Sequence, residues 1–459
     1  MTGERVSADV DHAFDHRRSA PWDWVVLAVV APVFLYPAPF PRLAVLLALA
    51  ALPALWTSRT LLGSGVRTAR SPLTLLVAGV VGMAALAAWR SPVPAVSGPR
   101  ALGLVLGLLL YQTILTRMAH GDRLRWSVAA LLVIVTGTVI VGGLGAIWSQ
   151  SDRFPILAAY TQRSVSPIYR VPGTTSEGVN PNAVAVTTLY MLPIGAALLA
   201  SRRPTGSRAG SRRLGVGPFS KSVIAILVMV NGLILIMTQS RLAWLGMAAA
   251  LPCLLLLLRR PVYAVAFLTV LVIGVGRLYM LTLEPRYHYR GGDVMSSVTS
   301  RTPIWARALR GINEAPLAGI GLNAFRERVD SFDLPDSRAS AAPGTEVTGL
   351  TVPHAHNIFL QTALDLGLPG LIVYLALLLV ALTLCADIFR RAESPDKALA
   401  IGLAGSLVAQ HIFGLADAVS LGAKVGIFFW WNLGLIAGLH WRTRCADFAH
   451  GRLSDAAYV

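Results

Sequence analysis

Two histidines followed by an asparagine, His354-x-His356-Asn357, stand out in the carboxy-terminal third of the chain. Asn357 is a good helix N-cap and Gly367 a good helix end, which predicts a short helix over residues 358–366. His356 would then stand at a helix N-terminus, where the helix dipole disfavours imidazolium. A neutral imidazole can accept a proton near pH 7. His356 is therefore a candidate general base, with His354 as an accessory candidate.

Other interpretations of this histidine pair stay open. Two histidines at the junction of a loop and a membrane could simply be solvated. They could also supply two zinc ligands, but zinc needs three or four protein ligands, and the flanking loop offers no third one at a familiar spacing. The three cysteines show no metal-type spacing either: Cys253, Cys385 and Cys445. We therefore expect no metal and no cofactor.

Two arginines lie where an anion could be bound. Arg241 occupies a very short turn between two apolar segments, so its guanidinium stays close to the membrane surface. Arg301 directly precedes Thr302-Pro303, which we expect to be the N-cap and the first residue of a helix. A helix N-terminus binds anions through its free N–H groups. Two planar, permanently charged donors suit a diphosphate, although Arg241 could instead snorkel to the interface and Arg301 could be an ordinary surface residue.

The composition indicates which elements position these residues. Hydrophobic residues make up 55% of the 459 residues, charged residues make up 14%, and the mean hydropathy is +0.62. A soluble domain carries about 25% charged residues, so this chain lacks the polar surface that a soluble protein needs. We therefore predict an all-α polytopic membrane protein with about twelve transmembrane helices. The expected spans cover residues 22–40, 43–57, 72–89, 101–117, 126–148, 182–200, 222–238, 241–258, 261–281, 368–387, 397–415 and 423–441.

The charge pattern predicts the orientation of these helices. The net charge is +17. No dense Lys/Arg block sits in a soluble domain, which argues against nucleic acid as a partner. Basic residues are more frequent in the short loops that are cytoplasmic if the amino terminus lies inside. We expect both termini in the cytoplasm and the histidine motif on the exterior, periplasmic side. The resulting segments are a cytoplasmic tail (1–21), nine helices (22–281), an exterior loop (282–367), three helices (368–441) and a second cytoplasmic tail (442–459).

The exterior loop before the tenth span is far longer than a connection needs, and such loops are usually functional or disordered. Apolar residues recur in it at helical spacing after Pro303, which predicts a short amphipathic helix on the outer surface. The residues in that pattern are Ile304, Trp305, Ala308, Leu309 and Ile312, with Arg307 and Arg310 in the same stretch.

Four stretches between about residue 150 and residue 420 resemble the O-antigen ligase and O-antigen polymerase superfamily. The main one is His356-Asn357-x9-Gly367-x-x-Gly370. The others are Thr238-Gln-Ser-Arg-Leu-Ala-Trp, Ser300-Arg-Thr-Pro-Ile-Trp with Ala315-Pro-Leu-Ala-Gly-Ile-Gly-Leu after it, and Gly178-Val-Asn-Pro-Asn182-Ala. Each stretch is weak alone, but four in this order are specific.

The resemblance implies a metal-independent, inverting glycosyltransferase in the inner membrane. Such enzymes move a glycan from an undecaprenyl-diphosphate carrier to a hydroxyl of an acceptor glycan, such as lipid A-core, on the outer face. It implies that His356 is the essential histidine and that Arg241 and Arg301 lie at the diphosphate. Asp417, expected between the last two spans, resembles a family acidic residue. His354, Asn357 and Arg307 are accessory candidates.

Two other functions stay open. A polymerase of the same superfamily would differ mainly in its acceptor, and the single His-Asn-x9-Gly-x-x-Gly motif favours a ligase. A transporter of lipid-linked glycan would need charged or broken helices near the membrane midplane. The deep polar candidates for that role are Arg277, Gln410 and His411.

Overall fold

The computed structural model describes residues 41–62, 71–118, 123–146, 179–201, 221–262, 301–332 and 354–449, with a few more residues near 30 and near 269. Within these ranges the chain is helical or connects helices, and no strand is present. Five helical segments of the described residues are long and apolar enough to cross a membrane. The prediction of an all-α membrane protein is therefore confirmed. The count of twelve spans stays a prediction, since the first and ninth lie largely outside the described residues.

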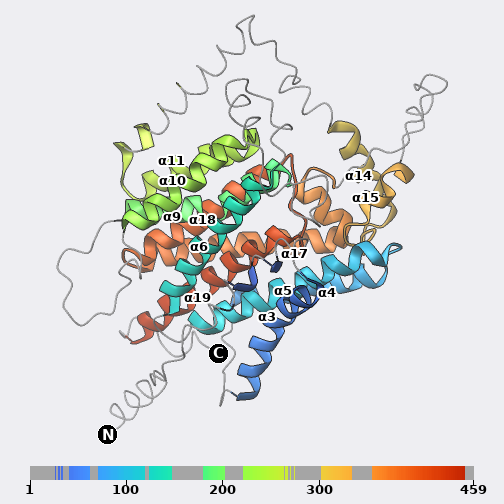
Figure 1. Cartoon of the computed structure of the whole chain (residues 1–459), viewed down its shortest axis with the longest axis horizontal. Helices are drawn as coiled ribbons and strands as arrows, with labels where there is room; N and C mark the ends of the chain where they lie inside the picture. Colours follow the sequence, from blue (N-terminus) through green and yellow to red (C-terminus); the bar gives the residue numbers. More distant parts are fainter. Residues whose placement is uncertain are drawn as a thin grey trace, which may run out of the picture.

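The helices form one bundle, which Figure 1 shows with α14 and α15 at the end where α4 and α5 meet. Their bounds are α3 Arg42–Leu62, α4 Pro72–Trp89, α5 Pro94–Met118, α6 Arg123–Leu144, α8 Pro181–Leu189, α9 Leu192–Ala200, α10 Lys221–Met237, α11 Arg241–Leu257, α14 Thr302–Glu314, α15 Phe325–Arg328, η3 Val329–Phe332, α17 Ile358–Arg391, α18 Asp396–Phe413, η4 Lys424–Gly426 and α19 Ile427–Ala449.

Glycines let the long helices approach closely. On α5, a Cβ at Gly107 would lie 2.3 Å from the ring of Trp430 on α19. On α11, a Cβ at Gly246 would lie 2.5 Å from the carbonyl oxygen of Ala409 on α18. Small residues at such crossings are typical of membrane helices, where association depends on close packing and not on the exclusion of water.

The segment predicted as one span over residues 182–200 is divided into α8 and α9. The break falls at Tyr190 and Met191, and Pro193 stands in the first turn of α9. Proline removes a backbone donor and fits only the first turn of a helix, so it favours a new helix start at this point. The predicted span itself is retained, since residues Pro181–Ala200 together are long and apolar enough to cross a membrane.

Helix α14 is the amphipathic helix expected in the long loop, and it packs on α17. Its buried side chains include Arg307, Ala308 and Ile312, whereas Leu309 is 53% exposed and does not belong to the buried face. The helix begins at Thr302, and Arg301 is the residue at the N-cap position. The expectation that Thr302 is the N-cap is therefore wrong by one residue.

Helix α17 contains a kink at the glycine that the sequence singles out. Asn357 caps α17, and Gly367 has φ 74° and ψ 175°, which interrupts the helix between the predicted short segment and the following span. A Cβ on Gly367 would lie 2.5 Å from the backbone carbon of Leu317. The sharp turn therefore requires glycine for its conformation and for its space. The predicted helix end at Gly367 is confirmed.

Candidate active site

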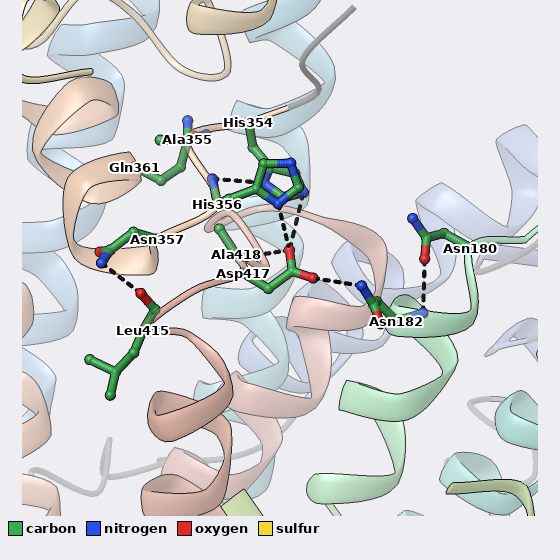
Figure 2. Close-up of polar contacts among 10 residues, drawn as sticks. All are labelled: Asn180, Asn182, His354, Ala355, His356, Asn357, Gln361, Leu415, Asp417 and Ala418. Carbon is green, nitrogen blue, oxygen red and sulfur yellow. Dashed lines mark hydrogen bonds and ion pairs between the residues drawn. The ribbon is translucent and has the colours of Figure 1, made fainter. Parts of the chain in front are cut away.

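The loop before α17 holds both histidines in a fixed conformation. Asn357 Oδ1 accepts hydrogen bonds from the N–H groups of Phe359 and Leu360, at 2.9 and 3.0 Å. Its Nδ2 donates to the carbonyl oxygen of Leu415 at 2.9 Å, which ties the loop to the turn after α18 (Figure 2). His356 has φ 47°, a left-handed conformation that is uncommon for a residue with a side chain. Strain of this kind tends to occur at functional sites.

Oδ1 of Asp417 faces both imidazole rings. Its Oδ1 is 3.5 Å from Nε2 of His354 and 3.5 Å from Nδ1 of His356 (Figure 2). The rings themselves lie 4.3 Å apart between centroids. Asp417 is 5% exposed. Asp417 follows His356 by 61 positions in the chain. The structure thus brings this acidic residue into contact with both histidines of the motif.

Two further donors fix the orientation of the Asp417 carboxylate. Asn182, in the first turn of α8, donates from Nδ2 to Oδ2 at 3.1 Å. The backbone N–H of Ala418 donates to Oδ1 at 2.8 Å. Asn180 caps α8 by accepting from the N–H of Asn182 at 2.8 Å, which holds Asn182 in place. The carboxylate is therefore oriented with Oδ1 toward the histidines.

The surroundings of His354 determine its protonation. Burial, opposed by the charge of Asp417, lowers the pKa of His354 to about 4, so the ring is neutral near pH 7. Nδ1 of His354 accepts the backbone N–H of His356 at 3.2 Å. The proton of the neutral ring must then sit on Nε2, facing Asp417. Both nitrogens of His354 are therefore engaged, which leaves it little capacity to act as a base.

Asp417 itself is held in the ionised form. Burial opposes its ionisation, but the interactions with His356 and His354 and the N–H of Ala418 outweigh burial and keep the pKa of Asp417 below its ordinary value. An ionised Oδ1 beside Nδ1 of His356 favours the tautomer with the proton on Nδ1. Nε2 of His356 then carries the lone pair, and no described residue forms a hydrogen bond with it.

A buried polar network supports the loop from the opposite side. Gln361 Oε1 accepts the N–H of Ala355, between the two histidines, at 2.8 Å. Gln361 Nε2 donates to Oδ1 of Asp365 at 2.8 Å, and the N–H of Asn323 donates to the same oxygen at 2.9 Å. The histidine loop is therefore connected through α17 to the turn between α14 and α15.

The two predicted arginines lie at helix N-termini. Arg241 is the first residue of α11, after Gln239, whose φ is 52°. Arg301 occupies the N-cap position of α14. Burial lowers the pKa of Arg301, while Asp417 acts in the opposite direction and Arg241 in the same direction. Arg301 thus lies within electrostatic range of both Arg241 and the carboxylate between the histidines.

The N-terminal turns of four helices contribute to this region: Asn182 from α8, Arg241 from α11, Arg301 from α14 and Asn357 from α17. Helix N-termini present free N–H groups and partial positive charge, which is the chemistry of an anion site. Asp417, which the family resemblance singled out, lies in the same region because its Oδ1 is beside both histidines. Arg307 lies on the buried face of α14, and no contact in the described residues connects it with the histidines.

Sequence reasoning missed Asn182 as a site residue. The stretch Gly178-Val-Asn-Pro-Asn182-Ala contributes to the family resemblance, but nothing in it indicates a contact with Asp417, 235 residues further along the chain.

The cluster of His354, His356 and Asp417 also bears on metal binding. The ligand atoms of these residues all lie within 4.8 Å of one another. Asp417 thus provides the third ligand that the loop sequence lacked. The missing third ligand therefore no longer speaks against zinc. The charges around the cluster oppose a cation, because Arg301 and Arg100 both lie within electrostatic range of His354. The absence of a metal stays a prediction.

Residues 224–375 match the family model described as O-antigen ligase. The resemblance to the O-antigen ligase superfamily is confirmed. The O-antigen ligase match extends from α10 to the middle of α17 and includes Arg241, Arg301 and both histidines of the loop. Asn182 and Asp417 lie outside it. No curated protein matches the chain.

The deep polar residues considered for a transporter form hydrogen bonds within α18 and from α18 to α17. Nδ1 of His411 donates to the carbonyl oxygen of Leu407 at 2.6 Å, and Nε2 then accepts from the hydroxyl of Tyr374 at 2.8 Å. Gln410 Nε2 donates to Ser406 at 2.8 Å. They line a pocket that also borders on Ile358. Their hydrogen bonds are satisfied within the bundle. Arg277 lies outside the described residues.

Proposed function

We propose that this O-antigen ligase-like membrane protein is a metal-independent glycosyltransferase. It moves a glycan from undecaprenyl diphosphate to a hydroxyl group of an acceptor glycan, lipid A-core or another surface glycan, on the outer face of the inner membrane. The observation that supports this most is that Oδ1 of Asp417 lies beside one nitrogen of each histidine, since this leaves one imidazole nitrogen, Nε2 of His356, available as a base.

The proposed reaction is a single displacement. The acceptor oxygen attacks the anomeric carbon of the donor sugar while the bond from that carbon to the diphosphate oxygen breaks, with inversion. The hydroxyl proton passes to Nε2 of His356, and the electron pair of the broken bond leaves with undecaprenyl diphosphate. Asp417 stabilises the imidazolium that forms, much as an aspartate does in a catalytic triad. Positioned proton transfer contributes typically about 10²–10⁴-fold.

In this proposal Arg241 and Arg301 stabilise the leaving group. The leaving group gains negative charge as the glycosidic bond breaks, and preorganised cations stabilise that charge. Guanidinium groups suit a diphosphate because they offer planar, paired donors and stay charged. The four helix N-termini near Asp417 add partial positive charge in the same region.

The direct test is a transfer assay with the purified full-length protein in detergent. It contains an undecaprenyl-diphosphate-linked glycan, candidate acceptors and no divalent metal. A new glycosidic bond to an acceptor supports the proposal, and an acceptor that is itself a growing chain of the donor glycan would identify a polymerase. Movement of lipid-linked glycan between the leaflets of a liposome without any new bond would indicate the transporter instead.

A further inference from the structure

A cationic residue that the proposed mechanism does not use lies at the start of α5. Arg100 is half-buried in the first part of this helix. In the described part of the chain its guanidinium forms no hydrogen bond and no ion pair. Asp365 and Arg326 lie within electrostatic range of it. A half-buried guanidinium in this situation keeps donors available for an anion.

Backbone packing brings a second cation to the same place. The carbonyl oxygen of Arg100 touches Gly422, where an added Cβ would lie 2.1 Å from it. Gly422 has φ 79°, so the close approach and the turn both depend on glycine. Lys424 follows two residues later as the first residue of η4. Lys424 lies within electrostatic range of Arg100, so the two cations are neighbours.

A third cation comes from the turn between α14 and α15. Ser97, one helical turn before Arg100, donates to the carbonyl of Leu322 at 2.7 Å, which fixes this turn against α5. Arg326 follows on α15, within electrostatic range of Arg100, and it is exposed with Glu327 at 3.4 Å as its neighbour. Arg100, Lys424 and Arg326 are called the α5 cationic cluster below.

The acids near this cluster do not balance it. Asp365 is 2% exposed, and its Oδ1 already accepts two hydrogen bonds, from Asn323 and Gln361. Glu327 is an exposed partner of Arg326 alone. Arg100 also lies within electrostatic range of His354, beside the proposed base. The cluster is thus an electropositive region that adjoins the histidines and comes from elements other than those that carry Arg241.

We propose that the α5 cationic cluster is a second anion site, which binds a phosphate or carboxylate group of the acceptor glycan close to the hydroxyl that reacts. This inference rests on the proposed function and deepens it, because it makes the acceptor an anionic glycan. Arg241 and Arg301 would hold the donor diphosphate, and the cluster would hold the acceptor, with His356 between them. Oxyanions are the chemistry that arginine and lysine recognise together.

The test measures binding of two probes to the full-length protein in an uncharged detergent. One probe is undecaprenyl diphosphate. The other is a glucosamine disaccharide with one phosphate monoester, compared with the same disaccharide after phosphatase treatment. We expect the wild-type protein to bind the phosphorylated disaccharide about tenfold more tightly or better, a factor that corresponds to ~1.4 kcal/mol. Arg100→Gln and Lys424→Gln should each remove most of this preference and change undecaprenyl diphosphate binding by less than about twofold.

Matched variants keep the result interpretable. Arg90→Gln removes an exposed arginine just before α5 and should change neither affinity. If Arg100→Gln does not fold, as its thermal unfolding would show, Lys424→Gln at an exposed position carries the test. Arg241→Gln should give the reverse pattern, with weaker undecaprenyl diphosphate binding and an unchanged phosphate preference.

Three results would overturn the inference. The wild-type protein could bind both disaccharides equally, or the two cluster variants could weaken undecaprenyl diphosphate binding as strongly as disaccharide binding, which would assign the cluster to the donor. Anionic phosphatidylglycerol added to the detergent could also abolish the phosphate preference where phosphatidylcholine does not, which would identify a lipid headgroup as the ligand. Failure of the proposed function is a separate result, namely no glycan transfer and no undecaprenyl diphosphate binding by the wild-type protein.

Discussion

Asn182 donates a hydrogen bond to Oδ2 of Asp417 at 3.1 Å, although 235 residues separate them in the chain. This contact joins the first turn of α8 to the turn after α18, and it directs the other carboxylate oxygen toward His354 and His356. The orientation of the histidines therefore depends on a helix start that lies outside the O-antigen ligase match.

Asn182→Ala should lower kcat for glycan transfer by about tenfold to a hundredfold, the cost of losing a hydrogen bond to a charged group. Without this donor the ionised form of Asp417 is less stable, so its pKa rises and the acid limb of the pH–rate profile moves to higher pH. Asn180→Ala is the control. It removes the cap of α8 but leaves the side-chain amide of Asn182, so it should lower the melting temperature and move the acid limb less than Asn182→Ala does. A purely structural role of Asn182 would make the two variants behave alike.

Because of His354, the protein should become less stable as the pH is lowered from 6.5 to 4. The pKa of His354 is lowered from its ordinary value of 6.5 to about 4. Between these values the unfolded chain binds more protons than the native state, so native stability increases as pH rises from 4 to 6.5. His354→Gln should flatten this dependence, which is worth up to about 3 kcal/mol. Thermal unfolding in detergent across this range measures it, and an unchanged slope in the variant would contradict the assignment.

Gly367→Ala should destabilise the protein by about 2 kcal/mol or more, because the residue has φ 74° and an added Cβ would lie 2.5 Å from Leu317. Gly82→Ala is the matched control. Gly82 lies in α4, where an added Cβ meets nothing within 4 Å, and alanine is the better helix former. The melting temperature should therefore fall for Gly367→Ala and should rise or stay unchanged for Gly82→Ala. Equal changes would mean that the kink in α17 does not need glycine.

Chelation should leave transfer unchanged. His354, His356 and Asp417 could geometrically hold a metal ion, but in the proposed reaction His356 is the base and Asp417 stabilises its imidazolium form. Extended dialysis against EDTA should therefore leave the transfer rate within about twofold of its starting value, since a required metal ligand set would lose far more. Loss of activity that added zinc restores would instead make this cluster a metal centre.

Local signals in the sequence were sufficient for the elements next to the histidines. Asn357 is followed by an apolar helix that ends at a glycine, and the structure has the N-cap and the kink at these residues. Capping and positive φ depend on a few neighbouring residues, so a single sequence contains the information. The same signals were less accurate at Thr302, which was predicted as the N-cap residue but is the first residue of α14.

The contacts that complete the candidate site could not be predicted in this way. Asp417 was singled out only through the family resemblance, since its neighbours form no pattern of their own. Its contacts with His356 and Asn182 depend on how α8, α17 and α18 pack, and no periodicity along the chain encodes that packing. The division between α8 and α9 had one local signal, Pro193, which the apolar run around it concealed.

The most direct measurement of the central proposal is the transfer rate of His356→Ala with undecaprenyl-diphosphate-linked glycan and a working acceptor. The account predicts a loss of about 10²–10⁴-fold, with undecaprenyl diphosphate binding and melting temperature close to those of the wild-type protein. His354→Gln, which leaves Nε2 of His356 in place, should lose much less. Transfer by His356→Ala at the wild-type rate would contradict the assignment of His356 as the base.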